Sequence, residues 1–158
     1  MKAMFVHGPH DVRLAELPKP EPGPGEVLVR IKSVGICGSD IHAYELFDNG
    51  GVTIASPLIL GHESAGVVEA LGPGVKGPAV GTPVAVDPSI SCEQCEFCLE
   101  GDPHVCQKNR FFGVYPTHGA LREYLTHPAH LVFPLAEGLS VMEGALLEPM
   151  GIAMYVTE

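Results

Sequence analysis

The chain has 158 residues, 46% of them hydrophobic, which suits a single domain with a packed core. Its formal net charge of −10 argues against nucleic acid and anionic membranes as partners. No apolar run has the length of a transmembrane helix or of a signal-peptide core, so the sequence predicts a reduced, cytoplasmic setting.

Short strands dominate the predicted secondary structure. Alternating apolar residues and flanking turn signals place them at residues 2–6, 12–17, 26–36, 64–71, 84–86, 111–114, 120–126 and 131–133. The third is the clearest, because Val27, Val29 and Ile31 face one way and polar residues the other. The proline-rich residues 18–26 predict a stiff surface loop rather than a ligand for a proline-binding domain.

A first helix is expected directly after the third strand. Cys37 stands between two glycines at this strand-to-helix corner, where the backbone has the freedom to turn tightly. Ser39 or Asp40 is expected to cap a short helix that runs through residues 44–47.

Two more helical stretches are expected near the end of the chain. Ser140 and Glu143 have the spacing of a capping box, which predicts that a helix begins there. Pro149 removes a backbone donor and disfavours helix at the residue before it. The sequence therefore predicts a break before Pro149 and a second helical stretch from Pro149 to the end.

Four cysteines cluster within fifteen residues, at Cys92, Cys95, Cys98 and Cys106. Four thiolates at short spacings supply the tetrahedral set that a structural zinc takes. Iron–sulfur motifs also open with Cys-x2-Cys-x2-Cys, but they continue with three residues, a fourth cysteine and a proline. Here seven residues intervene and Gln107 follows. A disulfide reading would need a secreted protein. The run therefore predicts structural zinc in a lobe at about residues 88–110.

A second set of potential ligands is scattered along the chain, at turns or element ends. It comprises Cys37, His62, Glu63 and Glu148. Thiolate, imidazole and carboxylate are the common zinc ligands, and a catalytic zinc takes three of them and keeps one position open. On the residues alone the signal is weak, because a lone cysteine is most often a core residue.

Four motifs in a fixed order carry a resemblance to a known family. They are GICGSDIH at residues 35–42, GHESAG at 61–66, the four-cysteine lobe, and GALLEP at 144–149. The whole chain resembles the zinc-containing medium-chain dehydrogenase/reductase family. Residues 111–124, followed by GALLEP, look most like its polyol (sorbitol/xylitol) dehydrogenase branch.

The resemblance implies a mainly β fold with short helices: a GroES-like, partly closed β-barrel catalytic domain over residues 1–158. In the family a Rossmann domain follows and carries NAD or NADP. No G-x-G-x-x-G stands between a strand and a helix here, so we expect about half of a dehydrogenase, inactive alone. Two zinc ions per chain and a full-length dimer or tetramer are also implied.

The resemblance also implies roles for the scattered ligands. Cys37 and His62 match ligands of the catalytic zinc. Glu63 and Glu148 match two acidic positions near it, of which one binds the metal directly and the other through water. Asp40 matches a carboxylate that orients the ligand histidine, as metal-bound imidazoles usually require.

Four further residues take roles from the resemblance. Ser39 matches the hydroxyl that takes the substrate proton, and His42 is placed to pass that proton to solvent. Gly38 and Ser39 are expected at the cofactor. Without the resemblance Ser39 is a helix cap and His42 belongs to a solvated helix face. Phe112 resembles a wall residue of the substrate pocket and is equally a core candidate.

Two departures from the family pattern bear on the sites. Glu93 replaces the glycine usual after the first lobe cysteine, which we expect to strain this turn without removing a ligand. Ala43 stands where polyol enzymes often have an aromatic residue, which predicts a wider substrate pocket.

The predicted reaction is oxidation of a small secondary alcohol or polyol to a ketone by hydride transfer to NAD(P), with zinc as Lewis acid. The alternative is a non-catalytic, zinc-stapled GroES-like module for binding or assembly. A zinc-free quinone reductase shares the fold but would lack both the cysteine lobe and the pair Cys37 and His62.

Overall fold

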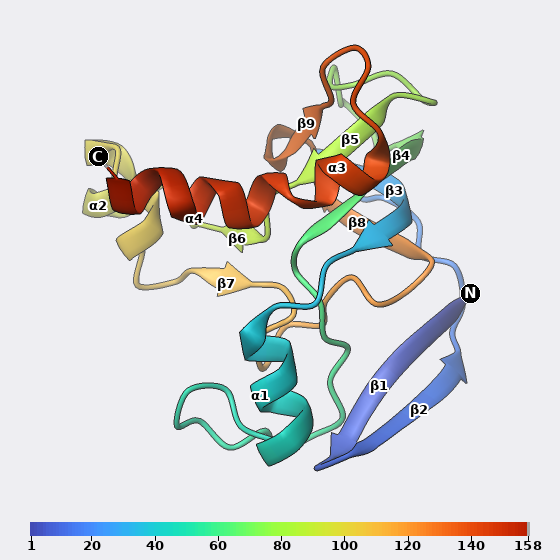
Figure 1. The fold of residues 1–158 in the computed structure, drawn as a ribbon. Helices are drawn as coiled ribbons and strands as arrows, with labels where there is room; N and C mark the ends of the chain where they lie inside the picture. Colours follow the sequence, from blue (N-terminus) through green and yellow to red (C-terminus); the bar gives the residue numbers. More distant parts are fainter. Residues whose placement is uncertain (158) are drawn as a thin grey trace.

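A five-stranded antiparallel sheet forms the centre of the fold (Figure 1). In the computed structural model, which describes residues 1–157, the strand order is β8–β3–β4–β5–β9. In that order the strands span Tyr124–Pro128, Glu26–Val34, Ser64–Leu71, Pro83–Val86 and Val132–Pro134. The mainly β prediction is confirmed. Within the described residues β8 and β9 do not pair, so the sheet closes only partly into a barrel.

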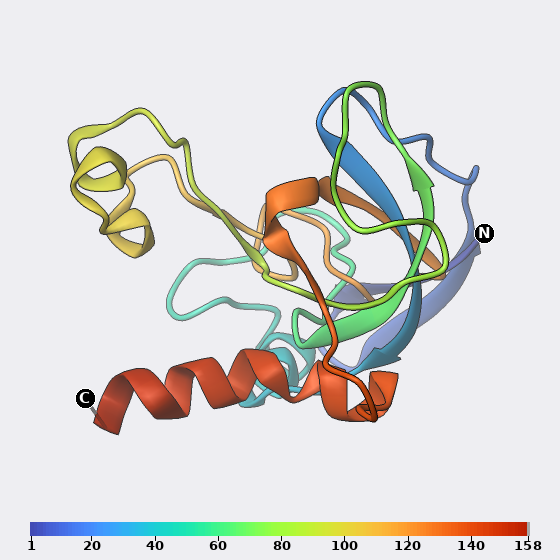
Figure 2. The same ribbon diagram turned by 90° about the horizontal axis from the view of Figure 1, so that it is seen from above.

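Two small sheets flank the central one. The strands predicted at residues 2–6 and 12–17 are confirmed as β1 (Lys2–Gly8) and β2 (Asp11–Glu16), which pair as an antiparallel hairpin. At the base of the cysteine lobe, β6 (Ser89–Ile90) pairs with β7 (Arg110–Phe111). The lobe itself holds α2 (Glu96–Glu100) and the short 3-10 helix η1 (Pro103–Val105), and a second such helix, η2 (Ala129–Leu131), links β8 to β9. Figure 2 shows the lobe projecting from the sheet.

The predicted cap of the first helix was wrong by two or three residues. Helix α1 spans Gly38–Leu46, and its N-cap is Cys37 rather than Ser39 or Asp40. Asp40 instead occupies the third helical position, and its carboxylate accepts a hydrogen bond from the N–H of Cys37 at 3.0 Å. The helix therefore begins at the cysteine itself.

The predicted helix break near the C-terminus is confirmed, although it lies earlier than expected. Helix α3 spans Val141–Ala145 behind the predicted capping box, and α4 runs over Leu147–Thr157. Pro149 lies in the first turn of α4, where its missing N–H would have no intrahelical partner. Glu158, the last residue of the predicted stretch, lies outside the described residues.

The strand predicted at 120–126 begins only at Tyr124. Residues 119–121 bond instead to the segment that precedes His62. The N–H groups of Gly119, Ala120 and Leu121 donate to the carbonyls of Ile59, Gly61 and Leu60 at 2.6, 2.8 and 3.0 Å. This loop therefore supports the turn that carries His62.

One face of the central sheet carries the main hydrophobic core. Its buried members are Val27, Val29, Val68, Val84, Val86, Phe112, Ala120, Leu125 and Val132. Helix α3 packs against β3, β4 and β5. Gly144 of α3 makes this packing possible, because a Cβ there would lie 2.7 Å from Leu135. In the described part of the chain no helix is long and apolar enough to cross a membrane.

Candidate metal centres

The four lobe cysteines converge as the sequence predicts. Their sulfur atoms all lie within 4.8 Å of one another, and no disulfide joins them in the described chain. The Sγ of Cys98 lies 3.4 Å from that of Cys95 and 3.9 Å from that of Cys92. A tetrahedral zinc with bonds of about 2.3 Å requires sulfur separations of about 3.8 Å. The arrangement therefore fits one tetrathiolate zinc.

Hydrogen bonds act unequally on the lobe cysteines. The N–H of Gln94 lowers the pKa of Cys92 to about 6. Cys106 Sγ accepts hydrogen bonds from the N–H groups of Cys92 and Lys108, each at 3.4 Å. The backbone N–H of Cys98 lowers the pKa of Cys95, but burial and the neighbouring thiols outweigh it and raise this pKa to about 11. Because the thiolate is the metal-binding form, Cys92 is the thiol best prepared for a cation.

The expected strain in the first lobe turn is present. Glu93 has φ of +57°, in the left-handed region that favours glycine. Its carboxylate pairs with Nε2 of His130 at 2.6 Å. His130 belongs to η2, so this contact joins the lobe to the segment between β8 and β9.

A second cluster brings together Cys37, His62 and Glu63, whose ligand atoms lie within 4.8 Å of one another. Cys37 stands between β3 and α1, whereas His62 and Glu63 directly precede β4. His62 is 5% exposed and Glu63 9%. Three of the four scattered ligands are therefore gathered in a largely buried place.

Two glycines allow this convergence. The N–H of Gly35 donates to the carbonyl of Glu63 at 2.7 Å, and a Cβ on Gly35 would collide with the Glu63 carboxylate. Gly61 has φ of +84°, and a Cβ there would lie 2.7 Å from Val34. Larger residues at either position would push the turn that carries His62 away from β3.

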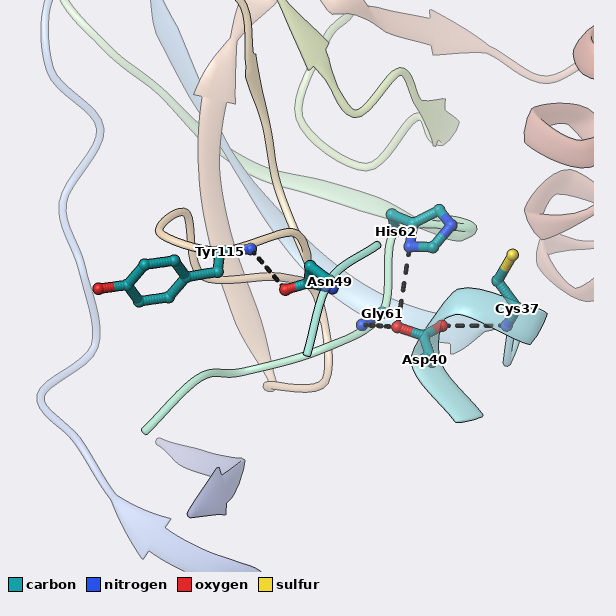
Figure 3. A network of polar contacts seen from close by, with 6 residues as sticks. All are labelled: Cys37, Asp40, Asn49, Gly61, His62 and Tyr115. Atoms are coloured by element: carbon teal, nitrogen blue, oxygen red, sulfur yellow. Dashed lines mark hydrogen bonds and ion pairs between the residues drawn. The ribbon is translucent and has the colours of Figure 1, made fainter. Parts of the chain in front are cut away.

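Asp40 ties the two ligand-bearing segments together (Figure 3). One carboxylate oxygen accepts from the N–H of Cys37 and the other from the N–H of Gly61, at 3.0 and 2.9 Å. Oδ1 also lies 3.8 Å from Nδ1 of His62, a charge contact longer than a hydrogen bond. Asp40 itself is 3% exposed. The role of orienting carboxylate, which the resemblance implies for Asp40, stays a prediction.

The orientation of His62 is compatible with a metal ligand. Its Nδ1 is buried and faces Asp40 without a hydrogen-bond partner among residues 1–157. The other ring nitrogen points away from Asp40, on the side where Cys37 Sγ lies (Figure 3). Phe111 packs against the ring at a centroid distance of 5.4 Å. Phe111 and Asp40 thus bracket the imidazole.

Glu148 lies beside this cluster and outside the group of mutually close ligand atoms. Burial raises its pKa, with the positive potential of His62 opposing and the charge of Glu63 reinforcing the shift. It lines a cavity of about 540 Å³ together with residues of the sheet, the lobe and α4. They include Asp87, His104, Asn109, Phe111 and Ile152.

The remaining predicted residues lie on α1 or in the core. Gly38, Ser39 and His42 are exposed on α1, and His42 Nε2 lies 3.6 Å from a carboxylate oxygen of Asp48. Phe112 is 1% exposed and belongs to the core.

Sequence reasoning missed Phe111 as a wall residue of the cavity. The signal was available, because successive residues of a strand point to opposite faces. β7 ends at Phe111, which lines the cavity, and Phe112 directly after it belongs to the core.

Comparison with known proteins places these features in a wider context. A family model described as the alcohol dehydrogenase GroES-like domain matches residues 23–137. A sorbitol dehydrogenase from Arabidopsis thaliana is 39% identical over 97% of this chain and 42% of its own length. The chain thus spans less than half the length of this curated relative.

Solved structures agree with this comparison. An alcohol dehydrogenase from Escherichia coli CFT073, complexed with NADH, superposes with a TM-score of 0.88 at 38% identity, over 99% of this chain and 44% of its own. A thermostable alcohol dehydrogenase from Pyrobaculum aerophilum, with cobalt and zinc bound, gives 0.80 at 35% identity, over 94% of this chain and 44% of its own.

Proposed function

The chain belongs to the alcohol dehydrogenase GroES-like domain family, and from this premise we propose that it is the catalytic-domain part of a zinc-dependent oxidoreductase. The substrate class is a small secondary alcohol or polyol, which becomes a ketone as hydride passes to NAD or NADP. The sorbitol dehydrogenase similar to this chain supports the polyol class, and the NADH-bound alcohol dehydrogenase supports the cofactor. One observation carries the proposal: Cys37, His62 and Glu63 meet beside the cavity that Glu148 lines.

The donor sets fit two zinc ions. In the lobe, four mutually close sulfur atoms suit a closed structural site. In the second cluster, sulfur, nitrogen and oxygen donors suit an open catalytic site. Zinc bound there would act as the Lewis acid that lowers the pKa of an alcohol oxygen. Cys37, His62 and Glu63 would hold it directly, and Glu148 would be the acidic group that acts through water.

The residues of this chain would do the positioning and the proton transfer. Asp40, whose Oδ1 lies 3.8 Å from Nδ1 of His62, would hold the imidazole in orientation. Ser39 would take the hydroxyl proton of the substrate, and His42, exposed on the same helix, would release it to solvent. Gly38 and Ser39 would lie beside the nicotinamide cofactor. A cytoplasmic location and a full-length dimer or tetramer complete the proposal.

Cobalt substitution tests the proposal on this chain. Co²⁺ in a site with one thiolate differs in absorption spectrum from Co²⁺ bound by four thiolates, so each site has its own signature. We expect two Co²⁺ signatures, and we expect sorbitol to perturb only that of the second cluster. A Cys37→Ser variant should lose the sorbitol-sensitive bands, whereas a Cys106→Ser variant should keep them. Sorbitol-insensitive spectra in the wild-type protein would favour the non-catalytic binding module.

A further inference from the structure

A separate cavity of about 290 Å³ lies between the β1–β2 hairpin and the later half of β3. None of its lining residues belongs to either cysteine-containing cluster or to the cavity beside Glu148. Most of its wall is apolar, formed by Ala3, Met4, Leu14, Ile31, Val34, Ala120 and Leu121. Its size lies near the lower limit of small-molecule pockets, about 300 Å³.

Three cations line this mostly apolar cavity, whose wall also includes Ser33 and Glu123: Lys2, Lys32 and Arg122. Ion pairs elsewhere in the described chain use other cationic side chains, and none of the three has a carboxylate within pairing distance. The carboxylate in the wall, that of Glu123, accepts the N–H of Lys2 at 2.7 Å. Among residues 1–157, three cations without an ion-pair partner thus surround one cavity, in a protein of net charge −10.

Arg122 is the most confined of the three. Its Nε is buried and has no hydrogen-bond partner within residues 1–157. Burial lowers the pKa of its guanidinium. The side chain as a whole is half-buried and lines the cavity. A partly desolvated cation gains more from a counter-charge than an exposed one does, so an anion that reaches this guanidinium from the cavity would be bound favourably.

We propose that this cavity binds a small organic carboxylate, with the carboxylate group at Arg122 and its hydrocarbon body against the apolar wall. The guanidinium fork matches the two oxygens of a carboxylate, and Lys2 and Lys32 add long-range attraction. The apolar wall selects an acid with a short hydrocarbon chain over a fully hydrated anion such as phosphate. This site is independent of the proposed zinc chemistry.

Hexanoate is a suitable probe, and NMR of the zinc-loaded chain is a direct readout. We expect saturable shifts of the Arg122 Nε–H signal and of the backbone amides of Lys2 and Lys32. Hexanamide, a neutral analogue of nearly the same shape, should bind at least tenfold more weakly, as should phosphate. An Arg122→Gln variant should lose at least tenfold in affinity, and Lys32→Gln severalfold.

Two controls separate this site from other sources of anion binding. Arg13→Gln removes an exposed guanidinium that already pairs with Asp11, and it should leave hexanoate binding unchanged. Cys37→Ala should also leave it unchanged, which excludes carboxylate binding at the second metal cluster. The proposal is overturned if the shifts fail to saturate, or if hexanamide or phosphate binds as tightly. If the Arg122→Gln variant does not fold, the Lys32→Gln variant takes its place. A folded Lys32→Gln variant that binds hexanoate as tightly as the wild-type protein also overturns the proposal.

Discussion

Gly35 decides whether Glu63 reaches the second cluster. A Cβ at this position would collide with the Glu63 carboxylate. The backbone hydrogen bond between Gly35 and Glu63 keeps the two residues close, so Glu63 cannot easily move away. We predict that Gly35→Ala displaces this carboxylate and weakens zinc binding at the second cluster by about ten- to a hundredfold, as loss of a supporting contact typically does. Competition with a chromophoric chelator measures this affinity.

Gly8→Ala is the matched control for this prediction, because a Cβ at Gly8 meets no atom within 4 Å. It should bind both zinc ions as the wild-type protein does. Equal affinities in the Gly35→Ala and Gly8→Ala variants would show that the Glu63 carboxylate contributes nothing to the site.

Glu93 holds a backbone conformation that costs about 1–2 kcal/mol for a residue with a side chain. Its exposed contact with His130 stabilises the folded protein by less than about 1 kcal/mol. We therefore predict that Glu93→Gly raises the free energy of unfolding of the zinc-loaded protein by about 1 kcal/mol. His130→Gln, which removes only the ion pair, should lower it by less than about 1 kcal/mol. Urea denaturation compares the two, and a Glu93→Gly variant less stable than His130→Gln would contradict the account.

At the scale of elements, β8 carries a buried histidine that makes stability depend on pH. His127 is 1% exposed, and its Nε2–H donates to the carbonyl of Asp87 at 2.7 Å. Burial lowers its pKa from 6.5 to about 4. Between these values the unfolded chain binds a proton that the folded chain does not. The stabilisation from neutral His127 is thus complete above about pH 6.5 and is lost as the pH falls towards 4.

We predict that the free energy of unfolding falls by about 3 kcal/mol from this residue over that pH range. A His127→Gln variant should show a flatter profile, whereas His10→Gln, at an exposed histidine, should keep the wild-type slope. Denaturation at a series of pH values without metal separates the effect from zinc release. Identical slopes in the wild-type protein and His127→Gln would refute the assignment.

Periodicity was enough to predict most strands, but it could not predict contacts between distant segments. The strand at 26–34 was evident because its alternation is a local property of the chain. The late start of β8 was not evident from the sequence, because it results from backbone hydrogen bonds between residues 119–121 and the segment before His62. The N-cap at Cys37 was not predicted, because cysteine is an unusual N-cap residue. The hydrogen bond at this helix start is accepted by the carboxylate of Asp40, which lies inside the helix.

The candidate sites were predictable to different degrees for the same reason. The lobe thiols converge because fifteen residues with short spacings leave them few alternatives. Cys37 and His62 lie 25 positions apart, and only the family resemblance suggested that they meet. Arg122 offered no signal in the sequence, because the missing hydrogen-bond partner of its Nε within residues 1–157 appears only in three dimensions.

At the scale of the whole molecule, the account requires two metal sites built by different parts of the chain. The lobe closes on itself through local spacing, whereas the second cluster needs β3, α1 and the turn before β4 in their correct places. Metal loading of the lobe therefore reports a local structure. Loading of the second cluster reports the complete fold.

Zinc content per chain, measured by elemental analysis on the wild-type protein and on Cys37→Ala, tests this central claim most directly. The account predicts about two zinc ions in the wild-type protein and about one in the variant, since the lobe keeps its own ion. One zinc ion in both proteins would mean that only the lobe binds metal. That result would contradict the catalytic assignment of Cys37, His62 and Glu63.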